Sequence, residues 1–294
     1  MVEELSREGA HVEAPAPSEP PPELWFRRGI HPLASLRELW QFRELTLSLA
    51  ERDLRIRYSQ AMLGAAWAIL TPLLLMLAFG LVFTKFARID THGAPYALFA
   101  YLGLVPWTFF SSAVAQGGLS LTLNVPLLNK LYCPREVFPI AQVLVAAVDA
   151  AMATVVLVLL FAITGYAPRV ESVWVPLLLL VLVAFTAGCT IAISVVVVYL
   201  RDLRLALPLA LQFAIFVTPV AYGADVITRS TGLLSLYAAL DPLVAVIDGL
   251  RRAVLWGQAP EGWPLLAGAG TSTLVLAGGF LLFKRLETGI ADIA

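Results

Sequence analysis

Residues 138–164 read FPIAQVLVAAVDAAMATVVLVLLFAIT, a long apolar run that contains a single charged residue, Asp149. About 20 mainly apolar residues are enough for a helix to cross the roughly 30 Å of hydrocarbon in a bilayer. At a rise of about 1.5 Å per residue, Asp149 lies about 16 Å from the start of the run. The run therefore predicts a membrane-spanning helix with an acid near the middle of the bilayer, facing protein or water rather than lipid.

The rest of the chain has the same apolar character. Hydrophobic residues make up 59% of it and charged residues 14%, whereas soluble domains carry about 25% charged residues. Further candidate spans are residues 61–83, 97–121, 174–200, 203–222 and 264–283. Pro208, Gln212 and Pro219 interrupt one of them, so it should pack inside the protein, where neighbours satisfy the freed carbonyl groups. These patterns predict an all-α membrane protein in which residues 61–294 form six transmembrane helices.

Lysine and arginine residues gather in segments that would share one side of the membrane. With the N-terminus inside, that side includes Arg52, Arg55, Arg57, Lys130, Arg135, Arg201, Arg204, Lys284 and Arg285. The positive-inside rule then places both termini in the cytoplasm. Residues 1–34 are acidic and proline-rich and lack an apolar core segment, which predicts a disordered cytoplasmic tail rather than a signal peptide.

Residues 35–60 have the pattern of an amphipathic helix. Ser35 and Glu38 have the spacing of a capping box, and apolar residues follow at helical intervals. Two pairs, Glu51 with Arg55 and Asp53 with Arg57, have the i,i+4 spacing of helical ion pairs. We expect an interfacial helix lying on membrane lipids at the cytoplasmic surface; a soluble helix packed on other cytoplasmic loops is the alternative.

A second short helix is expected outside the membrane, between the last two spans. Asp241 followed by Pro242 is typical of an N-cap with proline at the first helical position, and Gly257 supplies a stop. Asp248 can pair with Arg252 at i,i+4. We expect this helix, which also carries Arg251, to lie at or dip into the outer interface. It is interpreted as an outer gate or as a structural surface helix.

Signatures of enzymes and metal sites are absent from the chain. It has no phosphate-binding G-x-x-x-x-G-K-[S/T] segment and no clustered histidines or cysteines, so we expect no catalytic residue, metal or cofactor on it. The formal net charge of -1 gives no indication of a nucleic-acid partner. Asp149 is expected either to contact substrate or hold two helices in register, or to be bonded to a nearby Ser, Thr or Gln.

Aromatic residues along the spans could line a path for sugars, whose C–H faces stack on aromatic rings. An interfacial aromatic belt with ordinary packing is the alternative. The candidates for the path, besides Asp149, are Trp67, Phe79, Phe83, Phe213, Phe216 and Tyr222.

One segment before the first span resembles a known family. Residues 51–76, ERDLRIRYSQAMLGAAWAILTPLLLM, resemble the start of the permease subunits of ABC-2 type exporters for bacterial polysaccharides. Four later stretches are similar to the same family, in the same order: NKLYCPREVFPIA (129–141), YLRDLRLALPLALQFAIFVTPVAY (199–222), DPLVAVIDGLRRAVLWG (241–257) and FKRLETGIADI (283–293).

The resemblance implies a permease that works as two copies with two copies of a separate ATPase, which binds ATP and Mg. The loop after the second span would couple to that ATPase through Lys130, Tyr132, Pro134, Arg135 and Glu136. The first and fifth spans would line the path, and Asp241, Asp248, Arg251 and Arg252 would belong to the outer gate. The substrate would be a lipid-linked glycan, of O-antigen, capsular or teichoic-acid type, exported across the bacterial cytoplasmic (inner) membrane.

Two other functions remain open from the sequence. The chain could be an ABC-2 permease for a smaller lipid or drug. It could also be an ion-coupled carrier or an enzyme acting on polyprenyl phosphate, although the scarcity of intramembrane charge counts against both.

Overall fold

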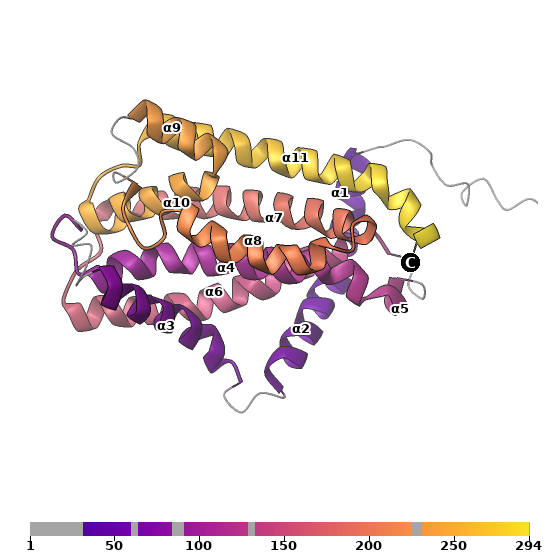
Figure 1. The fold of residues 1–294 in the computed structure, drawn as a ribbon, viewed down its shortest axis with the longest axis horizontal. Helices are drawn as coiled ribbons and strands as arrows, with labels where there is room; N and C mark the ends of the chain where they lie inside the picture. The colour runs from indigo at the N-terminus through magenta and orange to yellow at the C-terminus, as the bar shows by residue number, and fades with distance from the viewer. Residues whose placement is uncertain (1–31, 60–63, 84–90, 129–132, 225–230, 294) are drawn as a thin grey trace, which may run out of the picture. The chain divides into compact units, whose positions relative to one another are not determined.

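The computed structural model describes residues 32–59, 64–83, 91–128, 133–224 and 231–293, and all regular structure in these ranges is helical (Figure 1). The predicted tail lies outside these ranges except for residues 32–34, which are already helical. The all-α prediction is thus confirmed for the described part of the chain.

Within the described ranges, four helical segments are long and apolar enough to cross a membrane. They are α4 (Tyr96–Leu123), α6 (Val137–Thr164), the stretch Val170–Tyr199 formed by η3 (Val170–Trp174) and α7 (Val175–Tyr199), and most of α11 (Gly262–Ile293). The helices in the other two predicted spans, α3 (Ala66–Val82) and α8 (Leu203–Val217), are apolar but shorter.

The helix α8 ends five residues before the predicted end of its span. Thr218 leaves the helix with φ -72° and ψ 133°, because a residue that precedes proline, here Pro219, is disfavoured in the α region. Pro208 is accommodated inside the helix. The shortened helix leaves residues 218–223 as a non-helical turn at one end of the bundle.

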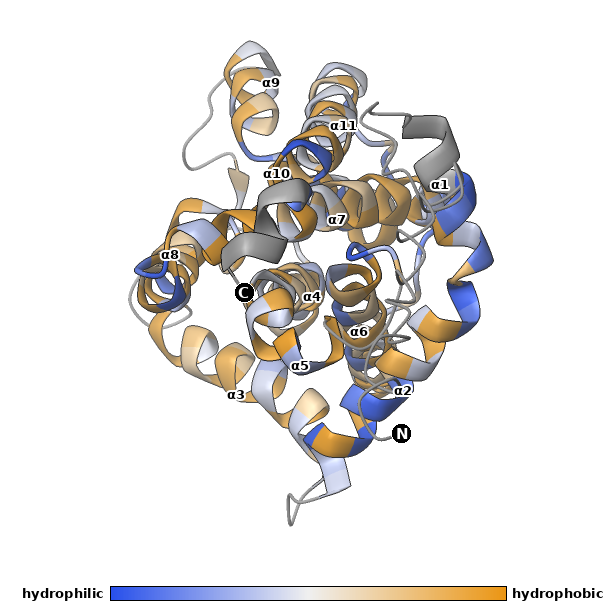
Figure 2. Ribbon diagram, turned by 90° about the vertical axis from the view of Figure 1, so that its right-hand side faces the viewer, coloured by the Kyte–Doolittle hydropathy of each residue, from blue (hydrophilic) through white to orange (hydrophobic). Residues whose placement is uncertain are grey.

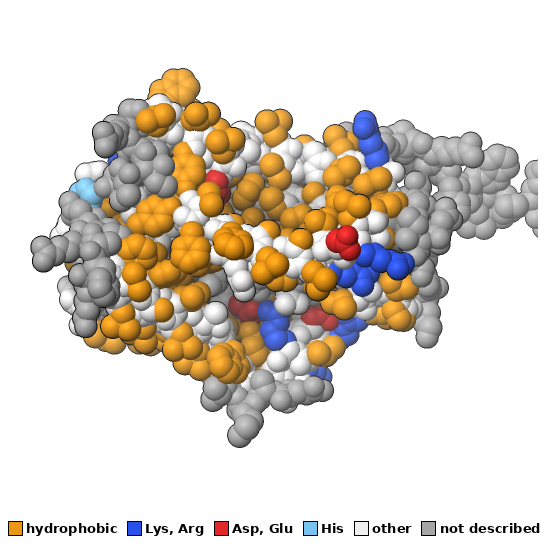
Figure 3. Space-filling model, in the orientation of Figure 1, with side chains coloured by type: hydrophobic (Ala, Val, Ile, Leu, Met, Phe, Trp, Pro, Cys, Tyr) orange, Lys and Arg blue, Asp and Glu red, His pale blue; other side chains and the backbone are white. Residues whose placement is uncertain are grey.

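The helix α4 occupies the centre of the bundle and contacts α3, α6, α7, α8 and α10 (Pro242–Arg251). Seen along the bundle, it is surrounded by mainly hydrophobic helices (Figure 2). Its Leu98, Phe99, Tyr101 and Leu104 are fully buried. The outer helices instead leave large apolar side chains exposed, which form much of the surface in Figure 3. Such a surface suits a lipid solvent.

The predicted amphipathic segment forms two helices, α1 (Pro32–Gln41) and α2 (Arg43–Ser59). Ser35 lies inside α1, so the capping-box prediction is wrong. The chain bends at Phe42, whose carbonyl accepts a second hydrogen bond, 3.0 Å long, from the Thr46 hydroxyl. Back-bonding of this kind bends helices. Beyond the bend, α2 packs along α6.

The short helix between the last spans has more neighbouring helices than the sequence predicts. It is α10, and α9 (Thr231–Leu240), which we did not predict, precedes it. The Asp241 carboxylate accepts from the Leu243 amide at 3.1 Å, which confirms the predicted N-cap. The apolar residues of α10, from Leu243 to Leu250, are buried, and the helix packs on α4, α7, α9 and α11.

The helices α7 and α11 approach each other closely at two glycines. A Cβ atom at Gly188 would lie 2.6 Å from the Leu276 backbone nitrogen, and one at Gly279 would lie 2.5 Å from the Gly188 carbonyl oxygen. Small residues allow this kind of backbone approach between membrane helices, where dispersion forces hold the helices together.

We predict that Gly279→Ala lowers stability by about 1–3 kcal/mol, because the added methyl group has no space against α7. A Cβ atom added at the neighbouring Gly278 would have nothing within 4 Å, so Gly278→Ala is the matched control and should leave stability unchanged or slightly higher. Thermal unfolding in detergent measures both variants. Equal unfolding temperatures for the two would contradict the close packing of α7 on α11.

Candidate functional site

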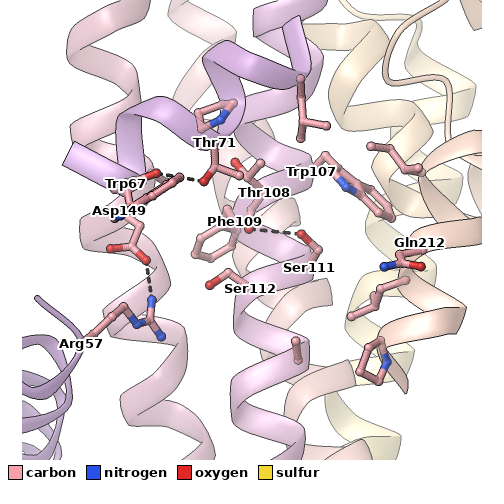
Figure 4. A pocket seen from close by; sticks show the side chains of 18 of the residues that line it. Arg57, Trp67, Thr71, Trp107, Thr108, Phe109, Ser111, Ser112, Asp149 and Gln212 are labelled. Carbon is pink, nitrogen blue, oxygen red and sulfur yellow. Dashed lines mark hydrogen bonds and ion pairs between the residues drawn. The ribbon is translucent and has the colours of Figure 1, made fainter. Parts of the chain in front are cut away.

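A cavity of about 840 Å³ lies among α2, α3, α4, α6 and α8 (Figure 4). Its walls combine aromatic rings with hydroxyl and amide groups. The aromatic residues are Tyr58, Trp67, Trp107, Phe109 and Phe216, and the polar ones are Thr71, Thr108, Ser111, Ser112 and Gln212. Pockets of this size with apolar walls and a few polar groups are typical ligand sites.

Arg57 and Asp149 are the charged residues among those that line the cavity. Arg57 Nη1 lies 2.6 Å from Asp149 Oδ2, and the Tyr58 hydroxyl donates a hydrogen bond to Asp149 Oδ1. Burial and the bond to Asp149 raise the pKa of Tyr58 to about 12, so its hydroxyl stays protonated. Asp149 is therefore held by an arginine and a tyrosine from α2, and not by the Ser, Thr or Gln that we considered.

Two ion pairs were predicted in the amphipathic segment, and the one between Asp53 and Arg57 is wrong. Glu51 and Arg55 do pair, at 2.8 Å. Asp53, however, binds Arg52 at 2.7 Å and accepts a hydrogen bond from Gln142, which leaves Arg57 to Asp149. The α6 surface offers both partners because α2 lies along it, and a local i,i+4 rule cannot anticipate that.

Two threonine hydroxyl groups in the cavity already donate to backbone carbonyls. Thr71 donates to Trp67 at 2.9 Å, and Thr108 donates to Val105 at 3.1 Å. Their oxygen lone pairs remain available as acceptors. The site can therefore combine stacking on aromatic rings with hydrogen bonds from ligand hydroxyl groups, and it has one arginine for an anion.

The structure brings together three of the predicted path residues, Trp67, Asp149 and Phe216, in the lining of the cavity. The other four lie elsewhere. Phe79 and Phe83 contact each other with ring centroids 5.9 Å apart, Phe213 is exposed on α8, and the Tyr222 hydroxyl donates to the Phe216 and Val217 carbonyls. Sequence reasoning missed Arg57 and Tyr58, although both stand in the RYSQ stretch that carries the family resemblance.

The predicted gate residues lie at the end of the bundle where α10 packs. Arg252 pairs with Asp248 at 2.6 Å, as predicted, and also with Glu261 at 2.6 Å. Asp241 accepts a 2.6 Å hydrogen bond from the Thr218 hydroxyl just beyond α8. The N-cap residue of α10 is thus tied to the turn that follows α8.

Arg251 lies at this end of the bundle, and only 1% of it is exposed. Its guanidinium donates to the carbonyl oxygens of Phe99, Pro219, Val220 and Tyr222 at 2.5–3.2 Å. It also lies 3.7 Å from the centroid of the Phe99 ring, a cation–π contact. One side chain of α10 therefore holds both α4 and the turn after α8.

The predicted coupling loop is described only from Cys133 onward, so Lys130 and Tyr132 lie outside the described residues. Pro134 is buried, and Arg135 Nη1 donates to the Glu287 carbonyl at 3.1 Å. The Glu136 side chain is 0% exposed and pairs with Lys284 of α11. Burial, with the nearby Glu287 carboxylate, raises the pKa of Glu136, while Lys284 opposes that rise. Arg135 and Glu136 thus bind the end of α11.

Comparison with known proteins agrees with this architecture. The profile of the ABC-2 type transporter family matches residues 44–255. The O-antigen export system permease protein RfbA of Myxococcus xanthus is 30% identical to the chain over 257 residues, which are 87% of the chain and 98% of that protein.

Two relatives of lower identity are also export or transport proteins by name. RfbA of Klebsiella pneumoniae is 28% identical, with 85% of the chain and 95% of that protein covered. The polysialic acid transport protein KpsM of Escherichia coli is 25% identical, with 80% of the chain and 91% of that protein covered. The family profile covers most of the chain, and a helical bundle with an apolar surface is consistent with a membrane transporter. The chain belongs to the ABC-2 type transporter family.

Proposed function

We propose that the chain is the permease subunit of an ATP-driven exporter of a lipid-linked polysaccharide across the bacterial cytoplasmic membrane. The observation that carries this proposal is the similarity to an O-antigen export permease over 98% of that relative's length. The glycan would be of O-antigen, capsular or teichoic-acid type. Two copies of the chain would assemble with two copies of an ATPase.

The chemistry of the cavity supports a glycan substrate. Its Trp67 and Trp107 rings offer faces on which the C–H groups of a sugar can stack. The nearby threonine and serine oxygens can accept hydrogen bonds from sugar hydroxyls. A small apolar drug would use the rings but leave the acceptor lone pairs of these oxygens unused.

We propose six membrane crossings, with α3 and α8 as the two short ones. At about 1.5 Å per residue, the 17 residues of α3 extend about 26 Å. A span shorter than the hydrocarbon can be accommodated by local thinning of the bilayer. Both short helices border the cavity, as expected of the walls of a translocation path. Both termini would then be cytoplasmic, with α2 running along α6 from the inner surface toward Asp149 and the α10 end as the outer gate.

The gate proposal draws on the bonds of Arg251 and Asp241. Arg251 joins α10 to the turn after α8, and Asp241 adds a second tie to Thr218. A movement of α8 would therefore be transmitted to α10. In this proposal the wall of the path and the outer gate open together.

Hydrolysis of ATP is assigned to the partner ATPase, which would bind ATP and Mg. We predict that the purified chain in nanodiscs hydrolyses no ATP, because it has no phosphate-binding loop. Adding the cognate ATPase should give turnover that depends on both proteins. Phosphate release measures the rate, and steady turnover by the chain alone would contradict the assignment.

For the coupling loop we propose that Glu136 acts as a positioning residue. Its side chain is enclosed, so it cannot touch a partner in this conformation. Its bond to Lys284 instead fixes the loop on α11. The surface that touches the ATPase would be the loop before it, around Lys130, Tyr132 and Arg135.

This role makes a prediction about Lys284, which is far from the loop in sequence. Lys284→Met leaves the Glu136 carboxylate buried without its cation, which costs about 3–5 kcal/mol, and should lower both thermal stability and ATPase co-purification. The double variant Glu136→Gln/Lys284→Met removes both charges and should restore both properties. Arg285→Met, at the adjacent exposed position, is the control. Full ATPase association and turnover with Lys284→Met alone would show that the pair does not position the loop.

A further inference from the structure

The pair formed by Arg57 and Asp149, in the middle of α6, differs from the pair of Glu136 and Lys284 at the start of α6 because it borders a cavity. The side chain of Arg57 is 28% exposed and that of Asp149 is 18% exposed, and both line the space of about 840 Å³. In contrast, the Glu136 side chain that binds Lys284 is 0% exposed. An ion pair that serves packing alone has no need of a cavity beside it.

Arg57 has donor capacity to spare for a ligand. It binds Asp149 Oδ2 through Nη1, whereas a guanidinium carries five N–H donors in a planar fork. That fork fits phosphate with two parallel hydrogen bonds. Figure 4 shows the guanidinium below the Asp149 carboxylate, on the side of the cavity where α2 lies.

Asp149 can release Arg57 without becoming an unpartnered buried acid. The Tyr58 hydroxyl donates to its other oxygen, Oδ1. When an anion occupies Arg57, Asp149 therefore keeps one hydrogen bond and returns to the arginine when the anion leaves. A resident carboxylate of this kind weakens anion binding, and a transport site must let its substrate go.

The surroundings indicate what the anion is attached to. Trp67 of α3 and Phe216 of α8, both exposed apolar side chains, line the same cavity. An anion that reaches Arg57 past these residues would be carried on an apolar chain. Phosphate on an isoprenoid chain and the headgroup of a phospholipid share this chemistry.

We propose that Arg57 binds the phosphate or diphosphate of the lipid-linked substrate and that Asp149 is the resident competitor that promotes its release. This inference rests on the proposed function, from which it takes the lipid link. It assigns to the permease itself, and not only to the ATPase, the recognition of the charged group between lipid and sugar.

The test is direct binding to the full chain purified in dodecyl maltoside, which contains no phosphate. Native mass spectrometry would compare farnesyl diphosphate with farnesol, its uncharged counterpart, and with phosphatidylglycerol. Farnesyl diphosphate should bind at least about tenfold more tightly than farnesol, as expected for a charged hydrogen-bonded contact. Equal binding of farnesol, or tighter binding of phosphatidylglycerol, would overturn the proposal.

Variants separate recognition from structure. Arg57→Gln should weaken the binding of farnesyl diphosphate about tenfold or more, and Asp149→Asn, which removes the competing charge, should tighten it. Arg55→Gln is the matched control, because Arg55 lies on the same helix and pairs with the exposed Glu51, and it should leave binding unchanged. If Asp149→Asn weakens binding as Arg57→Gln does, the pair is structural and the proposal fails.

A variant that unfolds would not decide the question, so a neutral pair completes the set. Arg57→Gln/Asp149→Asn has no buried charge left without a partner and should fold, yet it should bind farnesyl diphosphate no better than farnesol. Retained binding in this variant would overturn the role of Arg57. The assay uses neither ATPase nor glycan, so failure of the export proposal would appear in reconstituted transport and not here.

Discussion

A charged carboxylate can persist in an apolar helix only if the protein supplies its partners, because lipid supplies none. Asp149 meets this requirement through Arg57 and Tyr58, which come from a helix about ninety residues earlier in the chain. The pair therefore ties α2 to α6. It also lines the cavity that α2 and α6 form with α3, α4 and α8. The charged groups of the cavity are thus the acid and the arginine that neutralises it.

Both ends of the bundle are held by buried charges in a comparable way. At one end, Arg251 binds backbone carbonyls of α4 and of the turn after α8. At the other end, Glu136 and Lys284 join the start of α6 to α11. Between these two ends the long helices pack through apolar and small side chains. Gly188 of α7 and Gly279 of α11 are examples. The bundle thus has polar contacts at both ends, and the pair of Arg57 and Asp149 adds one between them.

Some features could be predicted from local sequence alone. The N-cap at Asp241 and the pair between Asp248 and Arg252 depend on residues within one or two helical turns, and both are present. The same local rule failed for Asp53 and Arg57, because partners from α6 and the neighbouring Arg52 replace the helical pairing. The end of α8 was missed because the apolar sequence continues past Thr218. The helix nevertheless ends there, because Thr218 precedes Pro219 and adopts an extended conformation.

In the candidate site, too, some features could be predicted from the sequence and others could not. Trp67, Asp149 and Phe216 were found because aromatic and charged residues stand out in apolar runs, but nothing in those runs separates them from Phe79 or Phe213, which line no part of the cavity. The sequence by itself determined that the chain is helical, apolar enough for a bilayer and similar to ABC-2 permeases, since these properties follow from composition and motif order. Tertiary structure alone decided which arginine neutralises Asp149 and which side chains share a cavity. Those facts depend on contacts between helices far apart in the chain, and periodicity within one helix carries no record of its neighbours.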